Sequence, residues 1–144
     1  MATLPDIRIN GSSTVYQDYG VRMGDGFLDA LTEPLSLKEN IENESRLEHG
    51  KRVVVEETPK FASRDVILDF TITGTTPDDF RRKKNAFLAL MYKGVITLQV
   101  PKESDDVYHL IYRGKGSDYS MNPQRTFCHM MLKFEEPDPS NRTL

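Results

Sequence analysis

Alternation of apolar and polar residues marks an extended segment near the middle of the chain. From Val66 to Thr73 every second residue is apolar, which is the period-two pattern of a strand with one buried face. The apolar face consists of Val66, Leu68, Phe70 and Ile72, and the opposite face is mostly polar. Gly74 and Thr75 then interrupt the pattern. We therefore predict a half-buried strand that ends at Thr73.

A helix is predicted directly after this strand, over residues 77–93. Thr76 offers a hydroxyl to an unpaired helical N–H, proline suits the first helical position, and Asp79 is the acidic residue three positions after the cap. The helix is amphipathic, and the residues expected to face the core are Phe80, Phe87, Leu88, Leu90 and Met91. Lys83 and Lys84 fall inside the same arc, so their side chains must extend along its edge to reach water.

Three further strands complete the C-terminal half. Residues 95–100 and 107–113 show strand patterns around a short polar turn, which predicts an antiparallel hairpin. Residues 114–122 are rich in Gly, Ser and Asp and predict a loop. The last strand is expected over 125–134, with Thr126, Cys128, Met130, Leu132 and Phe134 toward the core.

The N-terminal third gives weaker signals. A short strand is predicted within residues 1–10, followed by a turn at Gly11 to Ser13. Residues 14–23 predict a strand that bends or bulges at Gly20. For residues 27–31 a helical turn and an extended loop explain the sequence equally well.

A polar arm is predicted between the two halves. Residues 35–55 resemble two strand arms around a charged tip, and residues 42–51 contain a single apolar residue, Leu47. Such a segment cannot bury itself, so we expect an arm at about 40–52 that projects from the body. It is either a solvated loop or a segment that orders against another subunit. The candidate subunit-interface residues are Asn43, Glu44, Arg46, Leu47, Glu48, His49, Lys51 and Arg52.

Length and composition indicate one globular domain over residues 1–144, with 38% hydrophobic residues and a loose C-terminal tail at about 135–144. The formal net charge of −3 argues against a sequence-independent nucleic-acid binder. Cys128 is the only cysteine, which excludes an internal disulfide. The sequence lacks an apolar stretch long enough for a membrane span, so no membrane association is expected.

Candidate catalytic and metal-binding residues are sparse. Cys128 and His129 are adjacent on a strand and therefore point to opposite faces. His109 and His129 could meet across paired strands, but a third ligand is not evident. The run Gly114 to Ser117 lacks the spacing of a phosphate-binding loop, and the basic run 81–84 spreads around its helix. We therefore predict no metal, cofactor or small-molecule substrate and a structural or binding protein rather than an enzyme.

The succession of elements resembles a bacteriophage tail protein of the tail-tube and distal-tail (baseplate hub) type, and is similar to short tail proteins of prophages in gut anaerobes. The segments that carry the resemblance are 15–21, 42–51, 63–74, 77–93, 94–101 and the final strand to Phe134 with Glu136 and Pro137. The resemblance implies a mainly β protein with one amphipathic helix, in which an antiparallel β-sandwich or small β-barrel is flanked by the helix.

The same resemblance implies a role in assembly. It implies a ring, typically of six subunits, whose inner sheets line a channel through which DNA passes and whose arm reaches a neighbouring subunit or ring. The expected partners are other copies of this chain and neighbouring tail proteins, and the expected location is the virion tail, assembled in the bacterial cytoplasm. Tube subunit, distal-tail ring and terminator fit equally well. Compared with longer distal-tail proteins, 144 residues leave no room for a second, carbohydrate-binding domain.

An alternative of a different class is a small β-barrel that binds a ligand or oligosaccharide. Tyr108, Tyr112 and Tyr119 would then act as stacking groups. An apolar cavity with convergent polar groups would favour this alternative.

Overall fold

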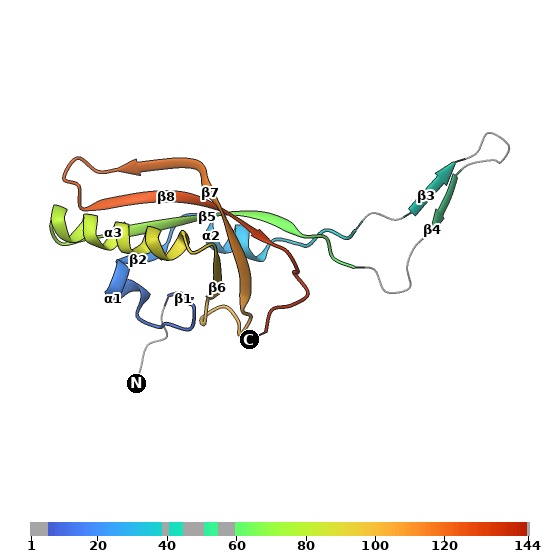
Figure 1. Cartoon of the computed structure of the whole chain (residues 1–144), viewed down its shortest axis with the longest axis horizontal. Helices are drawn as coiled ribbons and strands as arrows, with labels where there is room; N and C mark the ends of the chain where they lie inside the picture. The colour runs from blue at the N-terminus through green and yellow to red at the C-terminus, as the bar shows by residue number, and fades with distance from the viewer. Residues whose placement is uncertain (1–5, 39–40, 45–50, 55–59, 144) are drawn as a thin grey trace.

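The computed structural model describes residues 6–38, 41–44, 51–54 and 60–143 (Figure 1). Three helices and eight strands lie in this part of the chain. Their bounds are β1 (Arg8–Ile9), α1 (Val15–Tyr19), β2 (Val21–Met23), α2 (Phe27–Thr32), β3 (Ile41–Glu44), β4 (Lys51–Val54), β5 (Arg64–Thr73), α3 (Pro77–Met91), β6 (Val95–Gln99), β7 (Tyr108–Met121) and β8 (Phe127–Glu136).

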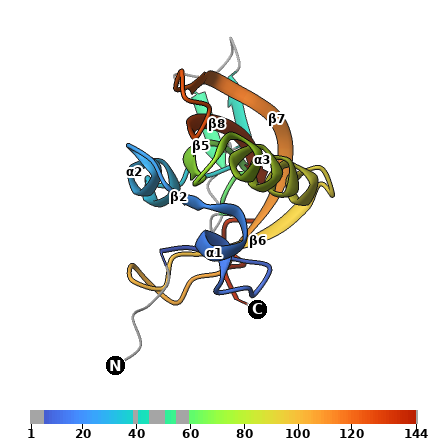
Figure 2. The same ribbon diagram turned by 90° about the vertical axis from the view of Figure 1, so that its left-hand side faces the viewer.

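Six of the strands form one antiparallel sheet in the order β1-β6-β7-β8-β5-β2. The pairing of β5 with β8 runs without interruption from Arg64 opposite Glu136 to Thr73 opposite Phe127. Figure 2 shows the strands curving around α3, so the sheet forms a half-barrel. The expected fold class, mainly β and antiparallel with a flanking helix, is confirmed. The described residues contain three helices instead of one.

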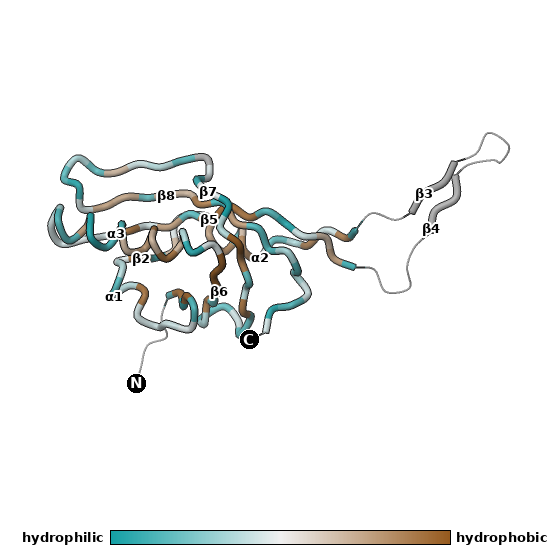
Figure 3. Tube along the Cα trace, in the orientation of Figure 1, coloured by the Kyte–Doolittle hydropathy of each residue, from teal (hydrophilic) through white to brown (hydrophobic). Residues whose placement is uncertain are grey.

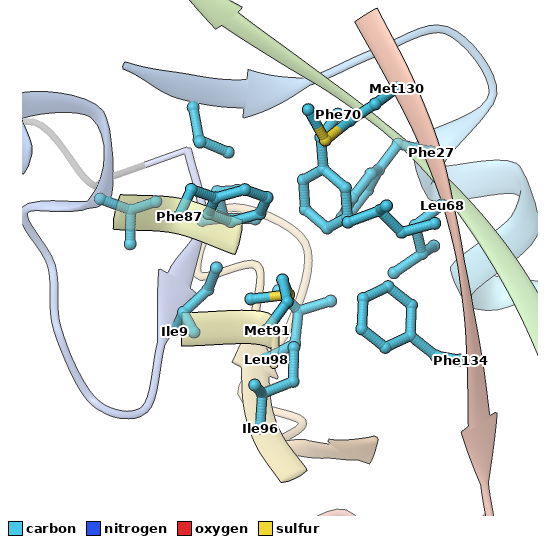
Figure 4. Close-up of a cluster of buried hydrophobic side chains, with 14 of the residues drawn as sticks. Ile9, Phe27, Leu68, Phe70, Phe87, Met91, Ile96, Leu98, Met130 and Phe134 are labelled. Atoms are coloured by element: carbon cyan, nitrogen blue, oxygen red, sulfur yellow. The ribbon is translucent and has the colours of Figure 1, made fainter. Parts of the chain in front are cut away.

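The core lies between the inner face of this half-barrel and α3. Phe70 of β5 contacts Phe27 of α2 and Phe87 of α3, with ring centroids 5.2 and 5.3 Å apart (Figure 4). The inner residues of β5 and β8 are those predicted from the alternation, and they are buried as expected: Val66, Leu68, Phe70, Ile72, Cys128, Met130, Leu132 and Phe134. Burial of these side chains is the main stabilising contribution to the fold.

Helix α3 begins as the sequence predicts. The Oγ1 atom of Thr76 accepts a hydrogen bond from the backbone N–H of Asp79 at 3.1 Å, and Gly94 has a φ of +98° just beyond the helix end. The first turns of α3 are hydrophilic (Figure 3). Lys83 lies 3.2 Å from Asp79, and Lys84 donates to the hydroxyl of Tyr119 at 3.0 Å, so both ammonium groups reach polar partners at the helix edge.

The strand predicted over residues 14–23 is wrong in its first half. Residues 15–19 form α1, in which Val15 is buried and the ring of Tyr19 lies 6.1 Å from that of Phe87. Val15 and Tyr19 are four residues apart and share one face of a helix, so burial against α3 favours the helix over the extended form. Gly20 then turns the chain with a φ of +66° into β2. Residues 27–32 adopt the helical alternative, as α2.

Two C-terminal predictions are also wrong. The segment 114–122, expected to be a loop, continues β7 as far as Met121, with register shifts after Tyr112 and after Lys115. The neighbouring strand β8 offers hydrogen-bonding groups along this segment, and that pairing outweighs the low strand propensity of Gly and Ser. The tail expected to be loose from residue 135 is attached to the body of the protein. β8 continues to Glu136, and Arg142 donates hydrogen bonds to the carboxylate of Glu136.

Strands β3 and β4 form a separate two-stranded sheet. In Figure 1 this hairpin lies away from the six-stranded sheet. The remaining residues of the predicted tip, 45–50, lie outside the described residues.

Candidate assembly surfaces

The predicted interface residues fall into two groups. Asn43 pairs in register with Arg52, and Glu44 pairs with Lys51, across the β3–β4 hairpin. Arg46, Leu47, Glu48 and His49 lie outside the described residues.

A short ribbon, here called the stem, lies between the body and this hairpin. Leu37 bridges Phe61 in antiparallel fashion, and backbone hydrogen bonds of 2.8 Å join Lys38 to Lys60 and Ala62 to Ser36. Leu37 is 54% exposed and Phe61 is 42% exposed. An isolated two-stranded ribbon is marginally stable in water. With two exposed apolar side chains, the stem is a candidate contact surface.

The base of the stem is anchored by a buried charge cluster. The carboxylate of Glu136, with no exposed surface, accepts hydrogen bonds from Arg64 at 2.7 Å and from Arg142 at 3.1 and 3.2 Å. Arg64 also donates to the carbonyls of Ala30 and Leu31 at 3.2 and 2.7 Å. Because α2 precedes the arm and β5 follows it, this cluster fixes both points where the arm leaves the body.

The outer face of the sheet, turned away from α3, carries paired charges. Lys133 of β8 lies 3.8 Å from Asp65 of β5, and Arg113 of β7 donates to Glu135 of β8 at 3.0 Å. Arg22 of β2 stacks over the ring of Tyr16 at 4.2 Å. Exposed pairs of this kind contribute little to stability, but they neutralise part of the positive charge on this face.

His129 links three strands on this outer face. Its Nδ1 atom lies 2.9 Å from Asp69 of β5, and its Nε2 atom lies 3.3 Å from Asp118 of β7. The hydrogen bond to Asp69 raises the pKa of His129, and the charge of Asp118 acts in the same direction. Only the doubly protonated ring can donate to both carboxylates at once.

The two histidines considered as metal ligands are not brought together. His109 contacts the backbone oxygen of Thr143 at 2.6 Å, whereas His129 contacts the two aspartates. Within the described ranges, no group of three or more His, Cys, Asp or Glu residues is arranged to hold a metal ion. Cys128 is buried, and burial raises the pKa of its thiol to about 11.

The tyrosines of the ligand-binding alternative do not converge. Tyr108 is buried beneath Arg142, Tyr112 packs on Phe134 and Tyr92, and Tyr119 contacts Lys84. A shallow hollow of about 350 Å³ lies elsewhere, at the start of α2. Its lining residues are Met23, Gly24, Asp25, Gly26, Phe27, Leu28 and Asp29.

Sequence reasoning did not find the charge cluster at Glu136 or the contacts of His129. Alternation placed Asp69 and His129 on outer faces, but their contact depends on the register of β5 against β8, in which Thr71 stands opposite His129. The sequence prediction places Glu136 in a loose tail. An acidic residue that continues the buried side of the β8 alternation is the signal that could have marked it.

Comparison with solved structures identifies the fold. The chain shares the fold of the Dit (gp 19.1) protein of phage SPP1. The two agree with a TM-score of 0.57 at 18% sequence identity, over 93% of this chain and 50% of the Dit chain. The present chain thus spans about half the length of that protein, which is described as a paradigm of the hub adsorption apparatus in phages that infect Gram-positive bacteria.

The other comparisons with known proteins do not identify a family. No family model matches the chain, and no curated protein matches it. Among the helices in the described part of the chain, none is both long and apolar enough to cross a bilayer. The likeness to Dit therefore establishes a shared fold and nothing finer.

Proposed function

We propose that this chain is a non-enzymatic structural protein of a phage or prophage tail that assembles into a ring in the tail tube or the distal tail. The observation that carries the proposal is the fold shared with SPP1 Dit over 93% of the chain. The ring consists of copies of this chain, with six as the expected number. Its neighbours are other tail proteins, and its location is the virion tail.

The charge arrangement of the outer face supports a channel lining for DNA passage. A surface that binds DNA neutralises phosphates with lysine and arginine side chains that are free to do so. Here Lys133 and Arg113 are each paired with a carboxylate, and the net charge of the chain is −3. Such a face lets DNA pass without retaining it.

The lateral strands of the sheet suggest which contacts close the ring. β1 has two residues and β2 has three, so the outermost strands offer few free backbone groups to a neighbouring sheet. Edge-strand pairing, which would be the simplest route to a ring, therefore gains little support from the fold. The arm and its stem are the favoured contacts.

Electron microscopy and native mass spectrometry of the purified chain test this proposal. Concentrated protein, alone or with the tail proteins encoded beside it, is expected to form closed rings, and native mass spectrometry is expected to give a mass of six copies. A species that stays monomeric in every mixture would count against a tail-ring function. Gene neighbours then distinguish tube subunit, distal-tail ring and terminator.

A further inference from the structure

We propose that protonation of His129 controls whether the distal half of β7, residues 114–121, stays paired with β8. The distal half of β7 is attached by few contacts, His129 connects it to β5, and a neutral imidazole cannot keep both of its partners. The segment is therefore held on the sheet in acid and released as the pH rises.

The distal half of β7 has a neighbouring strand on one edge only, among the described residues. On the opposite edge, β6 pairs with β7 as far as Ile111, so residues 114–121 extend beyond it. The pairing with β8 shifts register between Lys115 and Tyr119. Toward α3, the hydroxyl of Tyr119 accepts a hydrogen bond of 3.0 Å from Lys84, and its side chain stays half-exposed. A segment with so few buried contacts opens more readily than the strands at the centre of a sheet.

His129 supplies a side-chain contact where the backbone pairing is interrupted. Its Nδ1 atom lies 2.9 Å from Asp69 of β5, and its Nε2 atom lies 3.3 Å from Asp118 of β7. Asp118 belongs to the irregular part of β7, between the paired residues Lys115 and Tyr119. The two carboxylates differ in exposure, because the side chain of Asp69 is 9% exposed and that of Asp118 is 61% exposed.

The surroundings of Asp69 decide which nitrogen keeps the proton when the ring is neutral. A methyl group on Gly24 would lie 2.7 Å from the carboxylate carbon of Asp69, so the backbone at Gly24 covers one side of that carboxylate. A buried carboxylate needs a donor, and the Nδ1–H group of His129 supplies one. The neutral ring therefore presents the lone pair of Nε2 to Asp118. That contact becomes repulsive, and the exposed carboxylate of Asp118 moves to water.

The charges in contact with His129 are both negative among the described residues. Its register partners, Thr71 on β5 and Ser120 on β7, are uncharged. The basic residues of the outer face have other partners: Lys133 pairs with Asp65, Arg113 pairs with Glu135, and Arg22 stacks over Tyr16. Lys115 stands opposite the inner-facing Leu132, on the face turned away from His129. The hydrogen bond to Asp69 raises the pKa of His129 most, and the charge of Asp118 raises it further.

Amide hydrogen exchange measured by NMR tests the proposal. Protection factors, which are corrected for the chemical exchange rate at each pH, should be lower for residues 114–121 than for the β5 amides bonded to β8. In the parent protein they should fall about 5-fold over residues 114–121 as the pH rises through the titration of His129.

Asp118→Asn is the decisive variant, because the amide group of Asn donates to the unprotonated Nε2 atom. The fall in protection over residues 114–121 should disappear or reverse. Asp65→Asn is the matched control, since Asp65 is also 61% exposed on the same face but pairs with Lys133, and it should retain the fall.

Three results would overturn the proposal. The first is an unchanged protection of residues 114–121 across the titration in the parent protein, and the second is an equal fall in the parent and in Asp118→Asn. The third is protection of these residues equal to that of β5, because the segment would then open only when the whole domain unfolds.

Discussion

The guanidinium of Arg64 donates a hydrogen bond of 2.7 Å to the carboxylate of Glu136, and the two residues stand opposite each other at the end of the β5–β8 ladder. Arg142 occupies the second oxygen of the same carboxylate. The Arg64–Glu136 pair joins the first residue of β5 to the last residue of β8. Arg64 also donates hydrogen bonds to two carbonyls near the end of α2. The roots of the arm are therefore fixed by one buried carboxylate.

Glu136→Gln should destabilise the protein by about 3 kcal/mol, because it leaves two partly buried guanidinium groups without their common counter-charge. The free energy of unfolding from urea titration measures this. Glu135→Gln is the matched control, since it breaks the more exposed pair with Arg113 and should cost less than about 1 kcal/mol. Equal costs for the two variants would contradict the special role of Glu136.

Gly20→Ala should destabilise the protein far more than Gly26→Ala. Both glycines have a positive φ, +66° and +73°, which costs a residue with a side chain about 1 kcal/mol. A Cβ at Gly20 would also lie 2.2 Å from the carbonyl oxygen of Thr73, whereas none lies within 4 Å at Gly26. Thermal unfolding should show a clearly larger loss of stability for Gly20→Ala than for Gly26→Ala. Similar losses would mean that the backbone at Thr73 moves to make room for the new methyl group.

The pKa of His129 should lie above its usual value, and stability should depend on pH accordingly. Because the folded-state pKa is raised, the stabilisation is fully present below the usual histidine pKa and is lost as the pH rises through the raised value. NMR titration of the imidazole signals checks this. Asp69→Asn should return the pKa of His129 toward its usual value. An unshifted His129 titration would contradict the two-carboxylate contact.

Shortening the arm should block assembly without unfolding the body. Replacement of residues 43–52 by Asn-Gly joins Glu42 and Val53, which are partners in register, through a two-residue hairpin turn. Circular dichroism and the urea midpoint should stay close to the parent values, while ring formation is lost. As a matched control, Asn141→Ala with Thr143→Ala alters exposed tail residues outside the arm and should leave rings intact. Loss of folding in the shortened chain would make the arm a structural element of the body.

The sequence was sufficient for the elements whose local and tertiary preferences agree. The alternation from Val66 to Ile72 and the cap at Thr76 predicted β5 and the start of α3, because periodicity and capping are encoded within a few residues. The sequence did not predict the segments whose conformation depends on a partner that is distant along the chain. Gly114 to Met121 becomes a strand because β8 lies beside it, and residues 15–19 become a helix because α3 covers them.

The assembly surfaces were harder still to predict. The polar arm stood out by composition, but the Leu37–Phe61 bridge depends on which residues of the two stem segments face each other. The hollow at the start of α2 depends on how that short helix packs against β5. Neither relationship has a local signature in the chain.

The strand order has a consequence for how the protein is made. The strand β8 stands between β5 and β7 in the sheet, yet it is synthesised after both. While the ribosome extends the chain, one edge of β5 therefore lacks its hydrogen-bonding partner, and the core lacks the inner side chains of β8. Folding of the half-barrel must be completed after β8 emerges, and chaperone demand should be greatest in that interval.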